Sequence, residues 1–580
     1  MRLSARAIGL LLGLALVTTG FGQERRRREQ RPASGAAWNA RFDHPIQFQT
    51  LVDSGLLLVG TGRHLYGVDP RTGRELWRKR DLTVEAEDLL SVPGTDLLLV
   101  NDDHGGKFSD KESSVVALDR ATGADRWESK LVKGKGMHVV ADTESNILVL
   151  VTVKEPRGEG HELKRKPRLN VLDLATGKRL WDRDFDSDVV LRPSLDAEIS
   201  RGDRKQRERS FDLGNFQMPV IAGGQLFVTY RGIACYDAKT GDRLWRHNYD
   251  VREGDLALSD AEPIVDGQIV YTSGEGKVRA IDRVTGKRLW ESDDFGVVPE
   301  LFVDERAIYG RLGGRFYDVD DEEWRWKGPY GAVAIDRATG KRIWRYGGGN
   351  DSITNLSIVG DRVWLGDEER VIGLDRATGE RALHVRHNLE KRPILAGFHE
   401  SGHVVLVSDE EAGGFDASSG ARVWYARHEP IGPSGWKRFA AGLMMTSGAV
   451  LSVSSFAAAK FKGLLPAVPS PAIRISGLQP ITLFNSRAFV IRTGSRLGRS
   501  FWRAGEGMLG VTRFAHLTGT HQYFITKLDG TDQSLAGVNL ATGETDRAVE
   551  LPSRTPNIVI DEGNGLVFQT RGRDLVALRL

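Results

Sequence analysis

The chain contains little cysteine and proline, and neither sign of charge dominates it. One cysteine among 580 residues excludes an internal disulfide framework, Cys-ligated zinc sites and iron–sulfur clusters. Lys and Arg total 81 against 78 Asp and Glu, and a net charge of +3 excludes a polybasic nucleic-acid binder. Only 20 residues are proline, whereas 67 are glycine without a collagen period. This composition indicates a folded protein with many tight turns between short strands.

A long apolar run occurs only at the start of the chain, where residues 1–22 are typical of a cleaved secretory signal peptide. Arg2 and Arg6 are the basic residues, and Ala7–Val17 is the uncharged apolar run. That run is shorter than the roughly 20 residues of a membrane span, although an uncleaved anchor is the alternative. A charged linker is expected over residues 23–36. We therefore expect a periplasmic or secreted protein without a transmembrane segment in its mature chain.

One motif recurs nine times and dominates the rest of the sequence. It reads small residue, apolar residue, Asp, two residues, Thr-Gly, three residues, Trp, with Ser for Thr in one copy. Seven copies keep the Asp, the Gly and the Trp: Asp69, Gly73 and Trp77; Asp119, Gly123 and Trp127; Asp173, Gly177 and Trp181; Asp237, Gly241 and Trp245; Asp282, Gly286 and Trp290; Asp336, Gly340 and Trp344; Asp416, Gly420 and Trp424. Two weaker copies have another residue in place of Trp: Asp375 and Gly379 with Leu383, and Asn539 and Gly543 with Arg547.

Each copy predicts a β-hairpin. The Asp side chain can start a turn by accepting backbone N–H groups, and the Gly supplies a left-handed position without steric cost. A second hairpin precedes each copy, as at 263–272, which makes about four strands per repeat. Successive Asp positions from 69 to 416 lie 39 to 64 residues apart, a spacing that indicates a propeller blade. A large Trp at a fixed place suits the contact between neighbouring blades.

The arrangement of repeats predicts an all-β propeller of four-stranded antiparallel blades. Residues 37–424 hold the clear repeats, 425–538 are expected to hold degenerate blades with a possible inserted lid, and 539–580 are expected to form a closing blade. Residues 574–578 repeat the strand before each turn, and the strand around Trp38 is expected to complete that blade. We expect eight or more blades, in one large ring or in two rings.

The intact copies at Ala280–Trp290 and Ala334–Trp344 resemble the tryptophan-docking repeat of the quinoprotein, or PQQ-like, β-propellers. That family contains PQQ-dependent alcohol dehydrogenases and a non-enzymatic, BamB-like branch of protein-binding scaffolds. The resemblance implies the fold but does not separate an enzyme from a scaffold.

We predict a scaffold in the cell envelope that binds other envelope proteins, with no catalytic residue, no metal site and no cofactor. The alternative is a PQQ-dependent alcohol or sugar dehydrogenase, for which the resemblance implies PQQ and Ca²⁺. The adjacent cysteine pair of those enzymes is absent. The single Cys235 occupies the first position of the motif, two residues before Asp237, where the other copies mostly have a small residue, and this predicts a buried strand residue.

Three other sequence features are weighed against structural explanations. The string Trp181–Asp184 resembles one in the quinoprotein dehydrogenases but here continues a repeat. The carboxylates of Asp318–Glu323 could hold Ca²⁺, and a solvated loop between strands is the simpler interpretation. The pair His384 and His387 and the pair His399 and His403 are expected on strand edges or the surface.

Overall fold

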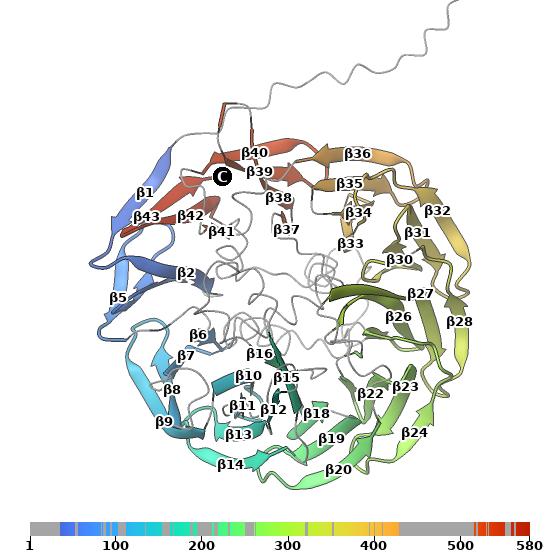
Figure 1. Ribbon diagram of the computed structural model, residues 1–580, viewed down its shortest axis with the longest axis horizontal. Helices are drawn as coiled ribbons and strands as arrows, with labels where there is room; N and C mark the ends of the chain where they lie inside the picture. Colours follow the sequence, from blue (N-terminus) through green and yellow to red (C-terminus); the bar gives the residue numbers. More distant parts are fainter. Residues whose placement is uncertain are drawn as a thin grey trace, which may run out of the picture.

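The computed structural model describes residues 35–428 and 515–580, apart from short internal segments of which 103–111, 154–162, 194–210 and 250–259 are the longest. These residues contain ten four-stranded antiparallel sheets and one three-stranded sheet. The ten sheets follow one another around a single ring, as Figure 1 shows. The predicted all-β propeller with eight or more blades is confirmed, and among the described residues its blades form one ring rather than two.

Nine blades are built from strands that are consecutive or nearly so, and we number them in chain order. Blades 1 to 3 are β2 (Ile46–Val52), β3 (Leu56–Thr61), β4 (Leu65–Val68) and β5 (Glu75–Lys79); β6 (Leu89–Ser91), β7 (Leu97–Asp102), β8 (Glu112–Asp119) and β9 (Asp125–Lys133); β10 (Lys135–Asp142), β11 (Ile147–Val153), β13 (Arg168–Asp173) and β14 (Arg179–Asp184). Blades 4 to 6 are β17 (Val220–Ala222), β18 (Gln225–Thr229), β19 (Gly232–Asp237) and β20 (Arg243–Asn248); β21 (Ile264–Asp266), β22 (Ile269–Gly274), β23 (Lys277–Asp282) and β24 (Arg288–Glu291); β25 (Glu300–Val303), β26 (Ala307–Asp318), β27 (Glu323–Asp336) and β28 (Arg342–Tyr346). Blades 7 to 9 are β29 (Ser357–Val359), β30 (Arg362–Gly366), β31 (Arg370–Asp375) and β32 (Arg381–Arg386); β33 (Leu395–His399), β34 (His403–Val407), β35 (Glu411–Asp416) and β36 (Arg422–Arg427); β37 (Ala515–Leu517), β38 (His521–Thr526), β39 (Ser534–Asn539) and β40 (Thr545–Glu550).

Blade 10 joins the two ends of the described chain. It consists of β41 (Ile558–Asp561), β42 (Leu566–Arg571), β43 (Asp574–Arg579) and, as its outer strand, β1 (Ala36–Arg41). Trp38 lies opposite Ala577 and Ala40 opposite Leu575 in an antiparallel ladder. This is the strand pairing that the sequence predicts, and it closes the ring. Residues 534–550 belong to blade 9, so the segment 539–580 spans parts of two blades.

The motif forms the turn between the third and fourth strands of a blade. In blade 5, Asp282 Oδ1 accepts the backbone N–H of Thr285 at 2.7 Å and that of Val284 at 3.1 Å. Gly286 then takes a left-handed backbone conformation, with φ of 70°. Hydrogen bonds to the charged carboxylate, first among them that from the Thr285 backbone, lower the pKa of Asp282 below its usual value.

The Trp of the motif connects each blade to the next one. In blade 5 the Trp290 indole N–H donates to the Arg337 carbonyl of blade 6 at 3.0 Å. Its ring covers Gly340 of the same turn, where an added Cβ would lie 2.5 Å from Trp290 Cε3. The glycine therefore serves both the turn and the inter-blade contact.

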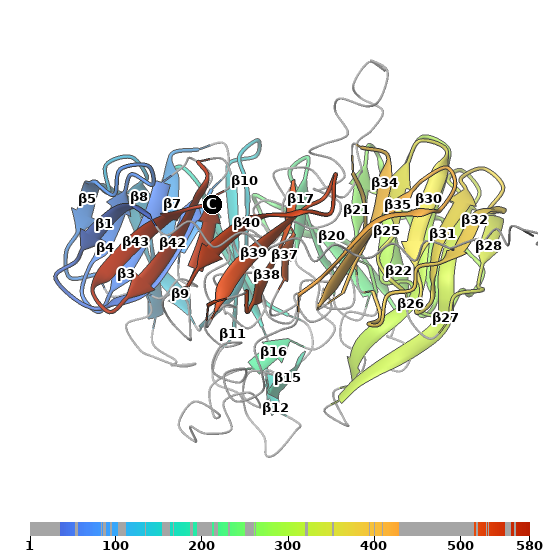
Figure 2. The same cartoon turned by 90° about the horizontal axis from the view of Figure 1, so that it is seen from above.

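The two faces of the ring differ in their connections. Because the strands of a blade alternate in direction, the motif turns and the turns between first and second strands lie on one face, which we call the motif face. The other connections lie on the opposite face, which we call the loop face. There a three-stranded sheet forms from β12 (Leu163–Arg165), β15 (Val189–Pro193) and β16 (Phe211–Leu213), and Figure 2 shows it below the ring.

The predicted signal peptide (1–22) and all but the last two residues of the predicted linker (23–36) lie outside the described residues. The possible lid and most of the predicted degenerate region, residues 429–514, lie outside them as well.

Candidate functional site

The loop face carries the features that distinguish one blade from another. The motif face is made of short turns, whereas the long connections leave from the loop face. In blade 6, β26 and β27 are 12 and 14 residues long and extend beyond the ring on that face, as Figure 2 shows. We call residues 314–318 of β26 and 323–327 of β27 the arm. Sequence reasoning missed the arm, whose signal is the run of aromatic residues on both sides of the acidic stretch 318–323.

The arm begins at a bulge. The pairing of β26 with β27 shifts between Leu312 and Gly314, and Gly313 and Gly314 have φ of 70° and 146°. A Cβ on Gly313 would lie 2.5 Å from the Lys327 carbonyl oxygen, so only glycine fits this close approach. The bulge re-aims the two strands out of the blade.

An ion pair between Arg311 and Glu300 lies at the root of the arm. The Arg311 side chain is fully buried, and its Nε lies 3.3 Å from Glu300 Oε2. Glu300 Oε2 also accepts the Leu356 backbone N–H of blade 7 at 3.2 Å. Burial raises the pKa of Glu300 to about 7, against the opposing charge of Arg311. The pair therefore couples the arm to the neighbouring blade.

Cross-strand pairs place the aromatic residues of the arm. Tyr317 lies opposite Trp324, and Arg315 lies opposite Trp326. The Arg392 guanidinium, from the connection between blades 7 and 8, lies over the Trp326 ring at 5.7 Å.

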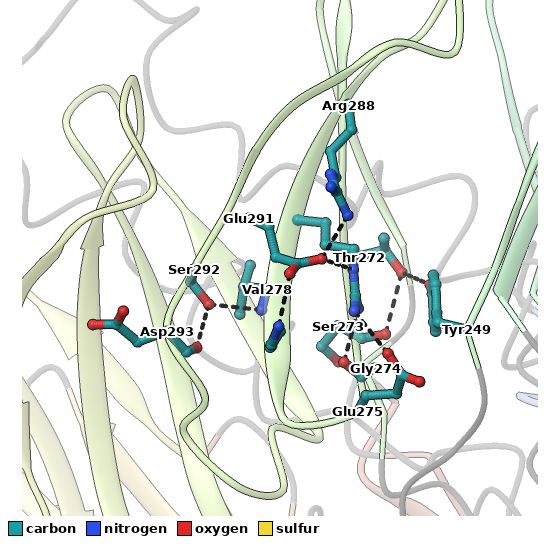
Figure 3. Close-up of polar contacts among 12 residues, drawn as sticks. Tyr249, Thr272, Ser273, Gly274, Glu275, Val278, Arg288, Glu291, Ser292 and Asp293 are labelled. Carbon is teal, nitrogen blue, oxygen red and sulfur yellow. Dashed lines mark hydrogen bonds and ion pairs between the residues drawn. The ribbon is translucent and has the colours of Figure 1, made fainter.

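A second polar cluster lies in blade 5 at the loop-face turn between β22 and β23. Figure 3 shows its hydrogen bonds and ion pairs. Arg279, whose side chain is 5% exposed, binds Glu291 Oε2 through Nε at 2.8 Å and the Gly274 carbonyl through Nη1 at 2.8 Å. Its guanidinium stacks over the Tyr249 ring at 4.4 Å. Glu291 also accepts Lys277, so the cluster is internally satisfied and fixes the turn rather than presenting a reactive group.

The motif residues do not converge on one point. The structure places the Asp and the Gly of each copy in the motif-face turns and each Trp on the outer strand, where the seven intact Trp side chains lie against the motif turn of the next blade. Trp38 plays the same part in blade 10, because its indole N–H donates to the Pro70 carbonyl of blade 1 at 2.9 Å.

The structure settles the position of the remaining candidates. Cys235 is fully buried opposite Trp245, as its place at the small first position of the motif predicts. Burial raises the pKa of its thiol to about 12. Asp182 pairs with Arg168 within blade 3. Asp318 ends β26 and Glu323 begins β27, with the residues between them outside the described part.

The expectation for the histidines is wrong in part. His387 and His399 are 1% and 4% exposed. The His387 ring lies against the Asp367 carbonyl in the β30–β31 turn, and the His399 ring bonds to the Ser401 hydroxyl. Within the described residues no group of three or more His, Cys, Asp or Glu side chains could hold a metal ion.

Comparison with known proteins assigns the family. The family model described as "Outer membrane protein assembly factor BamB" matches residues 111–294 and 330–461, more than half of the chain. The chain belongs to this family of PQQ-like repeat propellers. A BamB of Kangiella koreensis is 29% identical over 178 residues, 29% of this chain and 42% of that protein. A quinoprotein ethanol dehydrogenase of Pseudomonas aeruginosa is 25% identical over 197 residues, 29% of this chain and 31% of that protein. Each match thus spans less than half of the relative's length.

Two solved structures match about two thirds of the chain. The crystal structure of BamB from Moraxella catarrhalis matches with a TM-score of 0.34 and 14% identity, over 66% of this chain and 97% of that one. A europium-containing methanol dehydrogenase matches with a TM-score of 0.31 and 13% identity, over 67% and 85%.

The donor set of the described residues does not fit a Ca²⁺–PQQ site. Such a site requires several carboxylate and amide oxygens around the metal and cations around the quinone carboxylates. Carboxylates of the described residues are instead held in turns and ion pairs, as Asp282 is by the Thr285 backbone N–H and Asp182 by Arg168, and no group of three or more His, Cys, Asp or Glu side chains among these residues could hold a metal ion. We derive no chemical step through PQQ from these residues.

Proposed function

We propose that the protein is an exported, non-enzymatic scaffold of the cell envelope that binds other envelope proteins through the loop face of its ring. The observation that carries the proposal is the division between the two faces. Short turns form the motif face, whereas the arm, the three-stranded sheet and the long connections all leave the loop face. Binding residues are concentrated in connections held by a rigid framework.

The family supports the same function. A relative named as an outer membrane protein assembly factor matches 178 residues of this chain. A periplasmic or secreted location is proposed on the same ground and on the sequence of residues 1–22. The structure adds one finding: no helix among the described residues is long and apolar enough to cross a membrane.

The arm is the best-defined part of the proposed binding face. It is a two-stranded ribbon that leaves the blade, and its sequence holds four aromatic residues, Phe316, Tyr317, Trp324 and Trp326. Aromatic side chains supply large contact areas at protein interfaces, and Trp and Tyr are enriched where binding energy is concentrated. We therefore expect a partner protein to contact the arm.

The proposal can be tested by shortening the arm. Replacing residues 314–327 with a two-residue Asn-Gly turn removes the ribbon and leaves blade 6 otherwise intact. After cross-linking in intact cells of the native host, we expect the full chain to yield discrete adducts with envelope proteins and the shortened chain to lose at least one of them. A matched control replaces the exposed motif-face residue Val284 with Ala and should leave every adduct in place. Identical adducts from all three proteins would contradict a role for the arm.

A PQQ-dependent dehydrogenase is the second candidate, favoured by the two quinoprotein ethanol dehydrogenases among the relatives. A dye-linked oxidation assay with alcohols and sugars, after addition of PQQ and Ca²⁺, distinguishes the candidates. Turnover that depends on both additions would replace the scaffold proposal.

A further inference from the structure

The arginine at the root of the arm is buried without the hydrogen bonds that its side chain can make. Arg311 lies in β26 just before the bulge at Gly313 and Gly314, and its side chain is fully buried. A guanidinium carries five N–H donors. Within the described part of the chain, Nε, Nη1 and Nη2 of Arg311 all lack a hydrogen-bond partner. Because buried polar groups in folded proteins are nearly always hydrogen-bonded, this guanidinium requires an acceptor.

Glu300 neutralises Arg311 only in part. Its Oε2 lies 3.3 Å from Arg311 Nε without forming a hydrogen bond, and the same oxygen accepts the Leu356 backbone N–H at 3.2 Å. Burial raises the pKa of Glu300 to about 7, and the charge of Arg311 opposes this shift. Burial also lowers the pKa of Arg311, but a guanidinium keeps its charge at neutral pH. At a pH near its pKa, Glu300 is therefore protonated in about half of the molecules while Arg311 remains a cation.

The position of the pair allows a small ion to reach it. Glu300 is 14% exposed, so the pair lies just below the surface, within reach of local opening. Gly314 lets the arm backbone approach the guanidinium closely, since an added Cβ there would lie 2.3 Å from Arg311 Nη1. Among the described residues, Glu300 is the one ion-pair partner of Arg311. An incoming anion therefore competes with a single carboxylate.

A buried cation with unpaired donors is costly unless an anion or another acceptor meets it. Guanidinium groups bind carboxylates and phosphates strongly, because their planar N–H donors match the spacing of two oxygens. We propose that Arg311 binds a small oxyanion of the carboxylate or phosphate class at the root of the arm, and that Glu300 takes up a proton from solvent as the anion binds. This site is independent of the proposed scaffold function, because binding requires no partner protein.

Titration calorimetry of the full chain with sodium acetate and with sodium sulfate, at constant ionic strength, tests the site. Acetate represents carboxylates, and sulfate represents phosphates while keeping its charge near neutral pH. We expect one anion to bind per chain with a dissociation constant below about 1 mM. The tighter of the two anions identifies the class of the natural ligand.

Two arginine variants locate the binding. Arg311→Met keeps the length of the side chain and removes its donors, so it should abolish binding. The matched control Arg345→Met removes an exposed arginine of the same blade and should bind as the parent does. If neither anion bound to the parent, or if Arg311→Met bound as tightly as the parent, the proposal would be overturned.

The pH dependence of the affinity tests the part played by Glu300, on which Arg311 and the Leu356 N–H act. Between about pH 8 and about pH 6 the protonated fraction of Glu300 rises from about one tenth to about nine tenths, so the affinity should rise about tenfold. Glu300→Gln stays neutral and should bind the anion with an affinity constant to within about twofold over this range. This variant decides the question if Arg311→Met does not fold. Loss of binding in Glu300→Gln, or a persisting tenfold change with pH, would contradict the proposal.

Discussion

Closure of the ring depends on Trp38, and its replacement by Ala should destabilise the whole protein. The indole N–H donates to the Pro70 carbonyl at 2.9 Å, the ring covers Gly73, and its centroid lies 5.7 Å from that of Phe568. Removing a fully buried Trp side chain costs about 3–5 kcal/mol, and the hydrogen bond contributes about 1 kcal/mol. Because Trp38 is only half-buried, we expect a loss of about 3 kcal/mol in the free energy of unfolding.

Urea unfolding followed by far-UV circular dichroism measures this loss. Trp38→Phe keeps an aromatic ring and removes the donor, so it should cost about 1 kcal/mol. The control Leu76→Ala changes an exposed outer-strand residue and should stay within about 0.5 kcal/mol of the parent. If Trp38→Ala unfolded at the same urea concentration as Leu76→Ala, closure through β1 and β43 would not hold the ring together.

Four further predictions concern one glycine of a motif turn, one buried carboxylate, the binding of PQQ and the start of the mature chain. Gly340→Ala forces a Cβ toward the Trp290 ring at a φ of 73° and should lower the free energy of unfolding in urea by more than about 2 kcal/mol. The control Gly360→Ala has open space around it and should cost about 1 kcal/mol. Equal costs would contradict the contact between Trp290 and Gly340. Burial raises the pKa of Glu300 from 4.5 to about 7, because the folded protein favours the protonated carboxyl. The resulting contribution to the free energy of unfolding is fully present below pH 4.5 and is lost as the pH rises through about 7. Glu300→Gln should therefore flatten the pH dependence of the melting temperature between pH 5 and 8 (roughly the span of the shift), and an unchanged profile would refute the assignment. Calorimetry with PQQ and Ca²⁺ should show no dissociation constant below about 10 μM, and sub-micromolar binding would favour the dehydrogenase. N-terminal sequencing of protein from the native host should begin between about residues 19 and 25, and an intact Met1 on cytoplasmic protein would refute export.

The blades were predictable from the sequence because each is a local unit. Asp, Thr and Gly at fixed spacing specify one turn, and the strands on either side of it pair with residues close in sequence. Asp282 and Gly286 show this directly, since all the turn bonds of their copy join residues within five positions. The pairing of Trp38 with residues near the end was also predictable, because one strand lacked its partner at each end.

What the sequence concealed depends on contacts between blades. Trp424 belongs to an intact copy of the motif, yet its buried indole N–H has no hydrogen-bond partner within the described part of the chain. The arm was hidden because an acidic stretch between aromatic residues also suits a loop, and the bulge at Gly313 and Gly314 has no distinctive pattern. His387 is buried against the Asp367 carbonyl of the β30–β31 turn, which lies 20 residues away in sequence and meets it only in the folded blade.

The assignment of binding to the loop face is the central claim, and face-resolved photo-cross-linking in the native host tests it most directly. A photoreactive residue is placed singly at the exposed loop-face positions Asp293, Asn350 and Lys391, and at the exposed motif-face positions Val284, Ala338 and Ala377. The account predicts adducts with envelope proteins from loop-face positions and none from motif-face positions. Adducts confined to the motif face, or formed equally from both faces, would contradict it.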